Sequence, residues 1–225
     1  HTTWIFNIKC YNDSINPEIM EVQAHGNIFE DIKTRELTGL GKKDYDKLKK
    51  NGYTSAMDIV KGLHSDVDGS IKTTGSNSVN CGDIIRRRQE LEYDMIVGVY
   101  DQVDGNKIFH TEYTFHIKPV HESILWGLMN FNLLKEFDDY IRSYNGTKED
   151  RDSRKKEREE YKKQIQDPNA LMKINPKLSG KQRRTQCTLH IDKLIESGIE
   201  YEARPIRITV PSKSRTFNKW EHFAH

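Results

Sequence analysis

The stretch from Tyr93 to Ile117 constrains the fold more than any other part of this 225-residue chain. Tyr93 to Gln102 (YDMIVGVYDQ) is apolar enough to form a central strand, and Lys107 to Ile117 alternates as a partner strand does. Between them, Asp104-Gly105 is a dipeptide typical of a tight hairpin turn. We therefore expect two neighbouring strands within one mixed sheet.

Shorter segments of strand and helix character surround this pair. We expect further strands at 4–11, 54–61, 69–74, 171–178, 185–191 and 207–210, and helices at 18–37, 43–50, 84–92, 123–144 and 192–197. Residues 74–80 are predicted to form a polar loop, and Asp83 is a suitable N-cap for the helix that follows it. The segment 148–166 has almost no apolar residues, so it is either a charged helix or disordered. Strands mixed with helices predict an α/β or α+β fold with a central mixed β-sheet flanked by helices.

Composition excludes several classes of protein. Charged residues make up 31% of the chain and hydrophobic residues 35%, and no apolar run approaches the roughly 20 residues of a membrane span, so we expect no membrane partner. The three cysteines are scattered, odd in number and without the spacing of a metal site. This usage favours a reducing compartment, and we expect a cytoplasmic protein without a disulfide framework.

Charge is distributed unevenly along the chain, although the net charge is only +2. Residues 147–184 hold thirteen Lys or Arg against seven Asp or Glu, whereas residues 1–146 come to about −5. We expect 1–146 to form a core with N-terminal helices that carries the active site. Residues 147–225 are then a basic part, packed on the same domain, that contacts nucleic acid. The alternative for the basic part is an ordinary solvated helix face.

The most informative chemistry lies between residues 58 and 72. A short apolar run that contains Asp58 is followed by a turn rich in Gly and Asp, and then by Ser70-Ile-Lys72. As two strands of a hairpin, these segments place Asp58 beside Lys72, with Ser70 on the same face as Lys72 because side chains alternate. A carboxylate that holds a divalent cation, next to a lysine that orients water, suits metal-dependent phosphodiester cleavage. The alternative is an ordinary hairpin turn with a solvated lysine.

Mg²⁺ needs only one or two carboxylates, because it keeps several waters and takes further oxygens from a substrate phosphate. Asp58 with one of Glu30, Asp83 or Glu112 would complete such a site, and the choice among them stays open. Each of the three also has an ordinary role: a surface helix position for Glu30, a helix cap for Asp83 and a cross-strand pair with a lysine for Glu112.

The arrangement Asp58–hairpin–Ser70-Ile-Lys72 resembles the nuclease core of the PD-(D/E)xK superfamily, especially type II restriction endonucleases. The strings at 70–86 and 181–187 also look like sequences of such enzymes. The resemblance covers roughly residues 26 to 117 and implies a restriction-endonuclease-like core. In it, Asp58 takes the first acidic position, Lys72 the lysine position, and Glu30 resembles the acidic residue on the first helix. Ser70 stands where Asp or Glu is usual, which implies a carboxylate recruited from a nearby helix, with Asp83 or Glu90 as the candidate and Glu30 as the alternative.

DNA contacts are expected mainly from the C-terminal part. Arg and Gln read guanine and adenine edges bidentately, whereas Lys mostly anchors phosphates. The candidates are Lys177, Lys181, Gln182, Arg183, Arg184 and Gln186, with Lys213 and Arg215 in a second patch. For both groups the alternative is a basic surface loop.

Three functions follow, in order of preference. The first is a Mg²⁺-dependent, sequence-specific endonuclease of double-stranded DNA, acting as a homodimer on a palindromic site. The second is a non-catalytic nucleic-acid-binding module, using the basic part and the Gly-rich link at 37–41, which looks like a helix-hairpin-helix element. The third is an interaction protein whose contact surface is the charged segment 148–166.

Overall fold

The computed structural model describes residues 24–52, 57–178 and 183–211. The predicted strand at 4–11 and the beginning of the predicted strand at 54–61 lie outside these ranges. So do four of the predicted DNA-contacting residues, Lys181, Gln182, Lys213 and Arg215.

A mixed four-stranded sheet forms the centre of the molecule. Its strands are β1 (Gly69–Thr74), β3 (Tyr93–Val103), β4 (Asn106–Ile117) and β7 (Tyr201–Pro211), in the order β1-β3-β4-β7. β3 and β4 form an antiparallel hairpin, and Asp104 and Gly105 take positive φ values of 45° and 75° in its turn, so the predicted hairpin is confirmed. β1 pairs with β3 in parallel, which makes the sheet mixed, as predicted.

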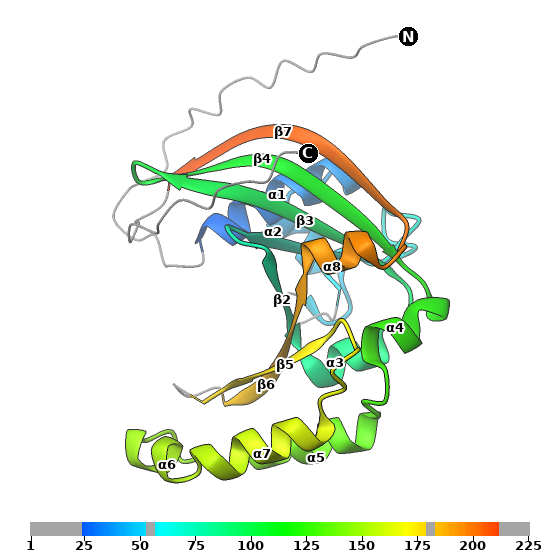
Figure 1. Cartoon of the computed structure of the whole chain (residues 1–225). Coiled ribbons are helices and arrows are strands. Elements are labelled where there is room, and N and C mark those ends of the chain that lie inside the picture. The colour runs from blue at the N-terminus through cyan, green and yellow to red at the C-terminus, as the bar shows by residue number, and fades with distance from the viewer. Residues whose placement is uncertain (1–23, 53–56, 179–182, 212–225) are drawn as a thin grey trace.

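A second, three-stranded antiparallel sheet was not predicted. It consists of β2 (Ser78–Asp83), β6 (Arg184–His190) and β5 (Lys173–Lys177), in the order β2-β6-β5. The prediction of a loop through residue 80 is wrong, because Val79 and Cys81 turn inward and are buried while β6 supplies the hydrogen bonds. Figure 1 shows this sheet extending away from the four-stranded sheet toward the helices at the far end of the molecule.

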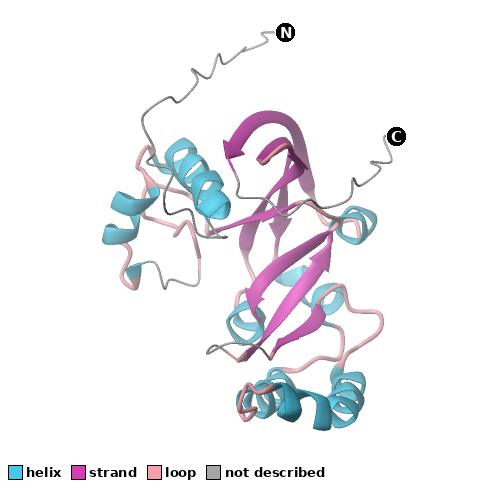
Figure 2. Ribbon diagram, turned by 90° about the vertical axis from the view of Figure 1, so that its left-hand side faces the viewer, coloured by secondary structure: helices cyan, strands magenta, loops and turns pink. Residues whose placement is uncertain are grey.

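Helices cover both sheets (Figure 2). They are α1 (Ala24–Thr38), α2 (Lys42–Leu48), α3 (Ile84–Gln89), α4 (Glu122–Trp126), α5 (Phe131–Arg142), α6 (Lys148–Ser153), α7 (Lys155–Ile165) and α8 (Ile191–Glu196). Asp83 caps α3 as predicted. For the charged segment, the structure agrees with the helical alternative, since α6 and α7 cover most of 148–166.

The single helix predicted for 123–144 is two helices. Gly127 ends α4 with a φ of 54°, a left-handed conformation that favours glycine. Asn130 then begins α5, because its side chain accepts a hydrogen bond from the Leu133 backbone N–H at 3.0 Å. The break leaves Leu128 86% exposed, although the helical spacing predicts that it faces the core.

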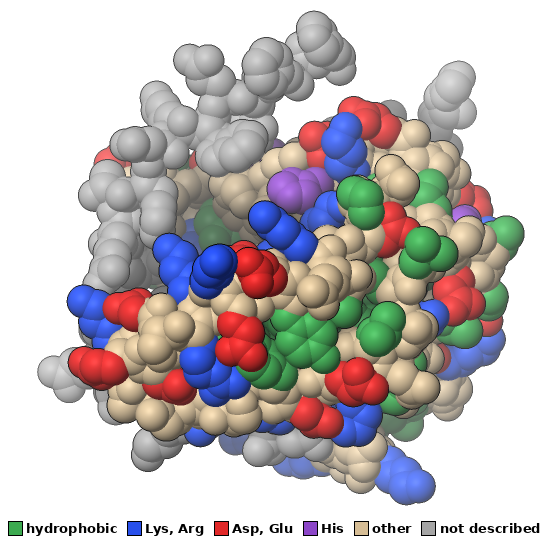
Figure 3. Space-filling view, turned by 60° about the horizontal axis from the view of Figure 1, so that its bottom comes forward, with side chains coloured by type: hydrophobic (Ala, Val, Ile, Leu, Met, Phe, Trp, Pro, Cys, Tyr) green, Lys and Arg blue, Asp and Glu red, His purple; other side chains and the backbone are tan. Residues whose placement is uncertain are grey.

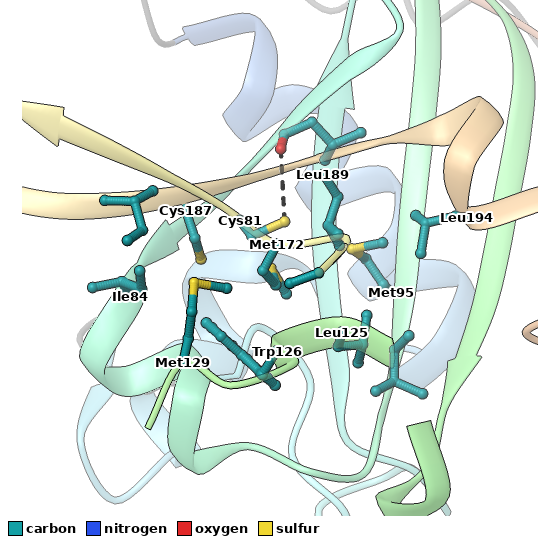
Figure 4. Close-up of a cluster of buried hydrophobic side chains, with 14 of the residues drawn as sticks. Cys81, Ile84, Met95, Leu125, Trp126, Met129, Met172, Cys187, Leu189 and Leu194 are labelled. Carbon is teal, nitrogen blue, oxygen red and sulfur yellow. Dashed lines mark hydrogen bonds between the residues drawn. The ribbon is translucent and has the colours of Figure 1, made fainter. Parts of the chain in front are cut away.

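The four-stranded sheet has a hydrophobic core on each face. On one face Phe29 of α1 stacks on Phe109 with ring centroids 4.6 Å apart, next to Tyr45, Ile59 and Ile71. The larger core lies on the other face, against the second sheet and α3 to α5. Figure 4 shows part of it, including Trp126 and the two thiols of Cys81 and Cys187. The two cores enclose β1 and β3 and fix the side of the sheet to which each β1 side chain points.

The basic part of the chain is built into both sheets. β6 pairs with β2, and β7 pairs with β4, so residues beyond 147 complete sheets that begin in the first half. Among the described helices, none has the length and apolar character that crossing a membrane requires.

Candidate active site

Asp58 and Lys72 meet at the open edge of the four-stranded sheet. β1 is one of the two edge strands, and the described residues 57–68 before it make a single antiparallel bridge to it, between Ile59 and Gly69. The Oδ2 atom of Asp58 accepts a hydrogen bond from the Ile71 backbone N–H at 2.6 Å and lies 3.1 Å from Lys72 Nζ. The predicted convergence of these side chains is confirmed, although the described part of the predicted first strand, 57–61, forms this bridge rather than a strand.

Contacts from α2 hold Asp58 in position. The Tyr45 hydroxyl accepts from the Val60 backbone N–H and donates to the Leu63 carbonyl, both at 2.9 Å. Lys49 Nζ donates to the Asp58 backbone carbonyl at 3.2 Å. α2 therefore fixes the turn that carries Asp58, so the carboxylate faces β1 in a set orientation.

Glu30 of α1 reaches the same place. Its Oε1 atom lies 3.0 Å from Lys42 Nζ, and its pKa is raised, first by burial and second by the negative charge of Asp58. Lys42 and Lys72 oppose this shift without cancelling it. We call Glu30, Lys42, Asp58 and Lys72 the edge cluster. Among the carboxylates predicted as partners of Asp58, Glu30 therefore lies close enough for the charge of Asp58 to raise its pKa.

The two carboxylates of the edge cluster suit a hard divalent cation. Within the part of the chain that the structure describes, no hydrogen bond reaches Oδ1 of Asp58 or Oε2 of Glu30. The same described ranges hold no group of three or more His, Cys, Asp or Glu side chains arranged to hold a metal ion. Two carboxylates plus water and phosphate oxygens are the ligand set that Mg²⁺ accepts.

Ser70 faces the interior of the molecule. Its side chain is buried, and its Oγ atom accepts a hydrogen bond from Arg87 Nη2 at 3.0 Å. Ile71 points the other way, into the core under α1, so Ser70 and Lys72 share one face of β1 as predicted. Ser70 makes no contact with the carboxylates of the edge cluster.

A polar cleft of about 210 Å³ opens beside Lys72. It is lined by Lys72, Cys81, Gly82, Asp83, Arg86, Arg87, Glu90 and Arg184, and we refer to it as the cleft. Four of these side chains are cationic and two are carboxylates, so its lining is positive overall. Lys72 belongs to both the cleft and the edge cluster, so the cleft lies next to the carboxylates of that cluster.

Asp83 lies in the cleft, but its carboxylate is already engaged. Its Oδ1 atom accepts from the backbone N–H groups of Ile85 at 3.0 Å and Arg86 at 3.1 Å, and Oδ2 lies 3.6 Å from Arg142. The predicted capping role is confirmed. A role in metal binding stays a prediction for Asp83, as it does for Glu90.

Glu112 belongs to a separate structural network. It is buried in the middle of β4, where its carboxylate lies 2.9 Å from Lys33 and 2.8 Å from Arg204. Glu36 of α1 pairs with both of these cations. We call Lys33, Glu36, Glu112 and Arg204 the buried cluster after its buried members Lys33 and Glu112, whereas Glu36 and Arg204 are exposed. The cross-strand alternative predicted for Glu112 therefore describes the structure, with Arg204 of β7 rather than a lysine as the cross-strand partner.

The described DNA-contact candidates are dispersed. Arg184 lines the cleft, and Arg183 Nη1 is 3.4 Å from the Asn145 carbonyl. Gln186 is mostly buried and accepts a hydrogen bond from Asn80 at 2.9 Å, whereas Lys177 is exposed at the end of β5. On the face in Figure 3, acidic and basic side chains are interspersed around hydrophobic ones. The basic side chains therefore do not form one continuous patch on that face.

Arg87 is the principal residue of the site that the sequence did not single out. The run Arg86-Arg87-Arg88, which begins three positions after the Asp83 cap, was a usable signal, because three successive positions span about 200° of a helix and so favour at least one that turns inward.

Comparison of the chain with protein-family models, with curated proteins and with solved structures finds no match.

Proposed function

We propose that this protein is a Mg²⁺-dependent endonuclease of double-stranded DNA, of the type II restriction class, and that the edge cluster is its active site. The single observation that carries the proposal is the meeting of Asp58, Glu30 and Lys72 at an open sheet edge beside the positive cleft. Carboxylates for a cation next to cations for a polyanion are what hydrolysis of a phosphodiester requires.

Each residue of the edge cluster has a distinct role in this proposal. Asp58 and Glu30 hold Mg²⁺, which when bound polarises the phosphate and lowers the pKa of a water. Lys72 is held by Asp58 at 3.1 Å, so its ammonium group stands ready to orient a water and offset charge that develops on the phosphate. Lys42 pairs with Glu30 and limits the repulsion between the two carboxylates. Ser70 takes no part in metal binding and acts through Arg87.

Incubation with plasmid DNA, with and without Mg²⁺, tests the proposal. Discrete fragments are expected with Mg²⁺ and none with EDTA. Lys72→Ala is expected to slow cleavage by about a hundredfold or more while DNA retardation in gels stays near that of the wild type. Lys118→Ala is the matched control, because Lys118 is an exposed lysine paired with Glu200 outside the site. Cleavage by Lys72→Ala at the wild-type rate would reject the assignment.

A non-catalytic nucleic-acid-binding module is the second candidate. Ser70 favours it, because this side chain supplies no carboxylate to the site and is occupied by Arg87. Retardation of DNA that weakens with salt, together with no cleavage at any Mg²⁺ concentration, would support this function over the endonuclease.

A second copy of the chain is part of the endonuclease proposal, because two symmetric sites cut the two strands of a palindrome. Sedimentation or light scattering with and without DNA measures this directly. A single monomeric species in both conditions would contradict it.

A further inference from the structure

Arg87 is a buried cation without an anionic partner. Its side chain is only 6% exposed, and none of the ion pairs among the described residues includes it. Its hydrogen bonds go to neutral groups: Nη2 donates to Ser70 Oγ at 3.0 Å, and Nε donates to the Cys81 carbonyl at 3.4 Å. The guanidinium carbon lies 4.5 Å from the centroid of the Tyr93 ring, on whose face it rests.

One nitrogen of this guanidinium has no hydrogen bond. Nη1 of Arg87 is fully buried, and no acceptor reaches it within the described part of the chain. Arginine does not lose its proton in proteins, so it cannot escape the cost of burial by becoming neutral. A buried positive charge with an unused donor indicates a missing anionic acceptor.

The surroundings of Arg87 show where that acceptor would bind. Arg87 lines the cleft together with Lys72, Arg86 and Arg184, so three further cations surround the same space. Of the two carboxylates in the lining, Asp83 is turned toward the first backbone N–H groups of α3 and toward Arg142. The guanidinium fork suits a tetrahedral oxyanion, which accepts two parallel hydrogen bonds.

We propose that the cleft is a binding site for a single phosphate group, with Arg87 as its central ligand, and that this site works without a metal. That the phosphate belongs to a nucleic-acid strand rests on the proposed function. In that case Arg87 would hold the scissile or a neighbouring phosphate next to Lys72. Phosphate binding itself requires neither cleavage nor Mg²⁺.

Position 70 provides a sharp test, because Ser70 is the neutral partner of Arg87. In Ser70→Asp a carboxylate pairs internally with the guanidinium and competes with an external anion. Ser70→Asn is the matched control, because the asparagine side chain has the same size as aspartate but carries no charge. Arg87→Gln removes the ligand itself, and Arg88→Gln is its control, since Arg88 pairs with Glu122 and does not line the cleft.

The experiment is calorimetric titration of the full chain in EDTA with inorganic phosphate, and with a short oligonucleotide that carries or lacks a terminal phosphate. Saturable binding of phosphate is expected, weakened about tenfold or more in Ser70→Asp and changed less than about twofold in Ser70→Asn and Arg88→Gln. Preference for the phosphorylated oligonucleotide would assign the site to a strand end, and equal binding of both oligonucleotides to an internal diester. Absence of phosphate binding, or equal affinity of Ser70→Asp and Ser70→Asn, would overturn the inference.

Failure of this inference and failure of the proposed function give different results. Asp58→Asn is expected to lose cleavage and to keep phosphate binding in EDTA. Phosphate binding that depends on the charge at position 70, in a protein that never cleaves DNA, would leave the cleft assignment intact and reject the endonuclease. Cleavage of DNA by a protein that binds no phosphate in EDTA would support the endonuclease and reject the phosphate site in the cleft. Circular dichroism and thermal unfolding of each variant identify any that fail to fold.

Discussion

Helix α1 contributes to two ionic clusters that differ in how their charges are compensated. In the buried cluster each carboxylate touches two cations, since Glu112 and Glu36 both contact Lys33 and Arg204. The pKa of Glu36 is lowered, because its hydrogen bonds to Lys33 and Arg204 outweigh the burial that raises it. In the edge cluster the pKa of Glu30 is raised, because burial and Asp58 outweigh Lys42 and Lys72.

This difference separates a structural site from a candidate functional one. Charges that are fully paired hold β4, β7 and α1 together and need no further ligand. Two carboxylates that repel each other are stabilised when a cation binds between them. Perturbed pKa values of this kind are common at functional sites. The same distinction applies to cations, because Lys33 is paired with carboxylates whereas Arg87 has no carboxylate partner among the described residues.

The largest effect is expected from breaking the buried cluster. Glu112→Gln should lower the free energy of unfolding by about 3 kcal/mol, because Lys33 would stay buried without its central carboxylate. Denaturant unfolding measures the loss. Glu200→Gln is the control and should change stability by less than about 0.5 kcal/mol, since its pair with Lys118 is exposed. Equal stability of Glu112→Gln and the wild type would remove the distinction between the clusters.

A smaller loss of stability is expected when the packing of α1 on the sheet is disturbed, since this helix contributes residues to both clusters. A Cβ atom at Gly98 would lie 2.5 Å from the Phe29 ring, which stacks on Phe109. Gly98→Ala should therefore lower the free energy of unfolding by about 2 kcal/mol through overpacking. Phe29→Leu combined with Gly98→Ala should recover part of the loss in the same unfolding assay. A purely additive double variant would show that the ring is not the cause.

Lys107 is a buried lysine that contacts the neutral Tyr100 side chain, and its titration shows whether such a cation loses its proton more easily than a paired one. Burial lowers its pKa from 10.5 to about 8, and its Nζ contacts the Tyr100 hydroxyl at 2.8 Å. Since the folded pKa is below the unfolded one, this group favours folding more strongly as pH rises from about 8 to 10.5. Lys107→Met should be more stable than the wild type by about 1 kcal/mol at neutral pH, with the difference shrinking above pH 8. A difference that is constant with pH would contradict the assignment.

The smallest effect, opposite in sign to that of Glu112→Gln, is expected from relieving the edge cluster. The folded pKa of Glu30 is above its unfolded value, so its ionisation costs stability above that range. Glu30→Gln should raise the free energy of unfolding of the metal-free protein by about 0.5 kcal/mol and abolish the stabilisation that Mg²⁺ gives the wild type. Thermal unfolding with EDTA and with Mg²⁺ checks both effects. A variant that is less stable in EDTA would show that Lys42 dominates Glu30.

Sequence patterns predicted the parts of the fold that local residues decide. The β3–β4 hairpin follows from a continuous apolar run, an Asp-Gly turn and an alternating partner. β2 was missed because Ser78, Asn80 and Gly82 have little strand propensity. Its partner strand, β6, is also about a hundred residues away in the chain. The break between α4 and α5 depends on the positive φ of Gly127, which hydrophobic spacing does not reveal.

The candidate site likewise contains residues that local sequence brings together and residues that only tertiary packing brings together. Asp58 and Lys72 are fourteen positions apart, so hairpin geometry sufficed to bring them together. Glu30 was one of several carboxylates of equal standing until the packing of α1 and α2 placed it near Asp58. The arginine run at 86–88 does not reveal which of its members is buried, because the burial of Arg87 depends on Ser70, Cys81 and Tyr93, which come from three different strands.

Calorimetric titration of Mg²⁺ into the wild-type protein and into Asp58→Asn tests the central claim most directly, because it measures whether the edge cluster holds a cation. The expected result is one Mg²⁺ per chain in the wild type and binding at least about tenfold weaker in Asp58→Asn. Equal Mg²⁺ affinity in the two proteins, or no binding in the wild type, would contradict the claim that Asp58 and Glu30 form a metal site.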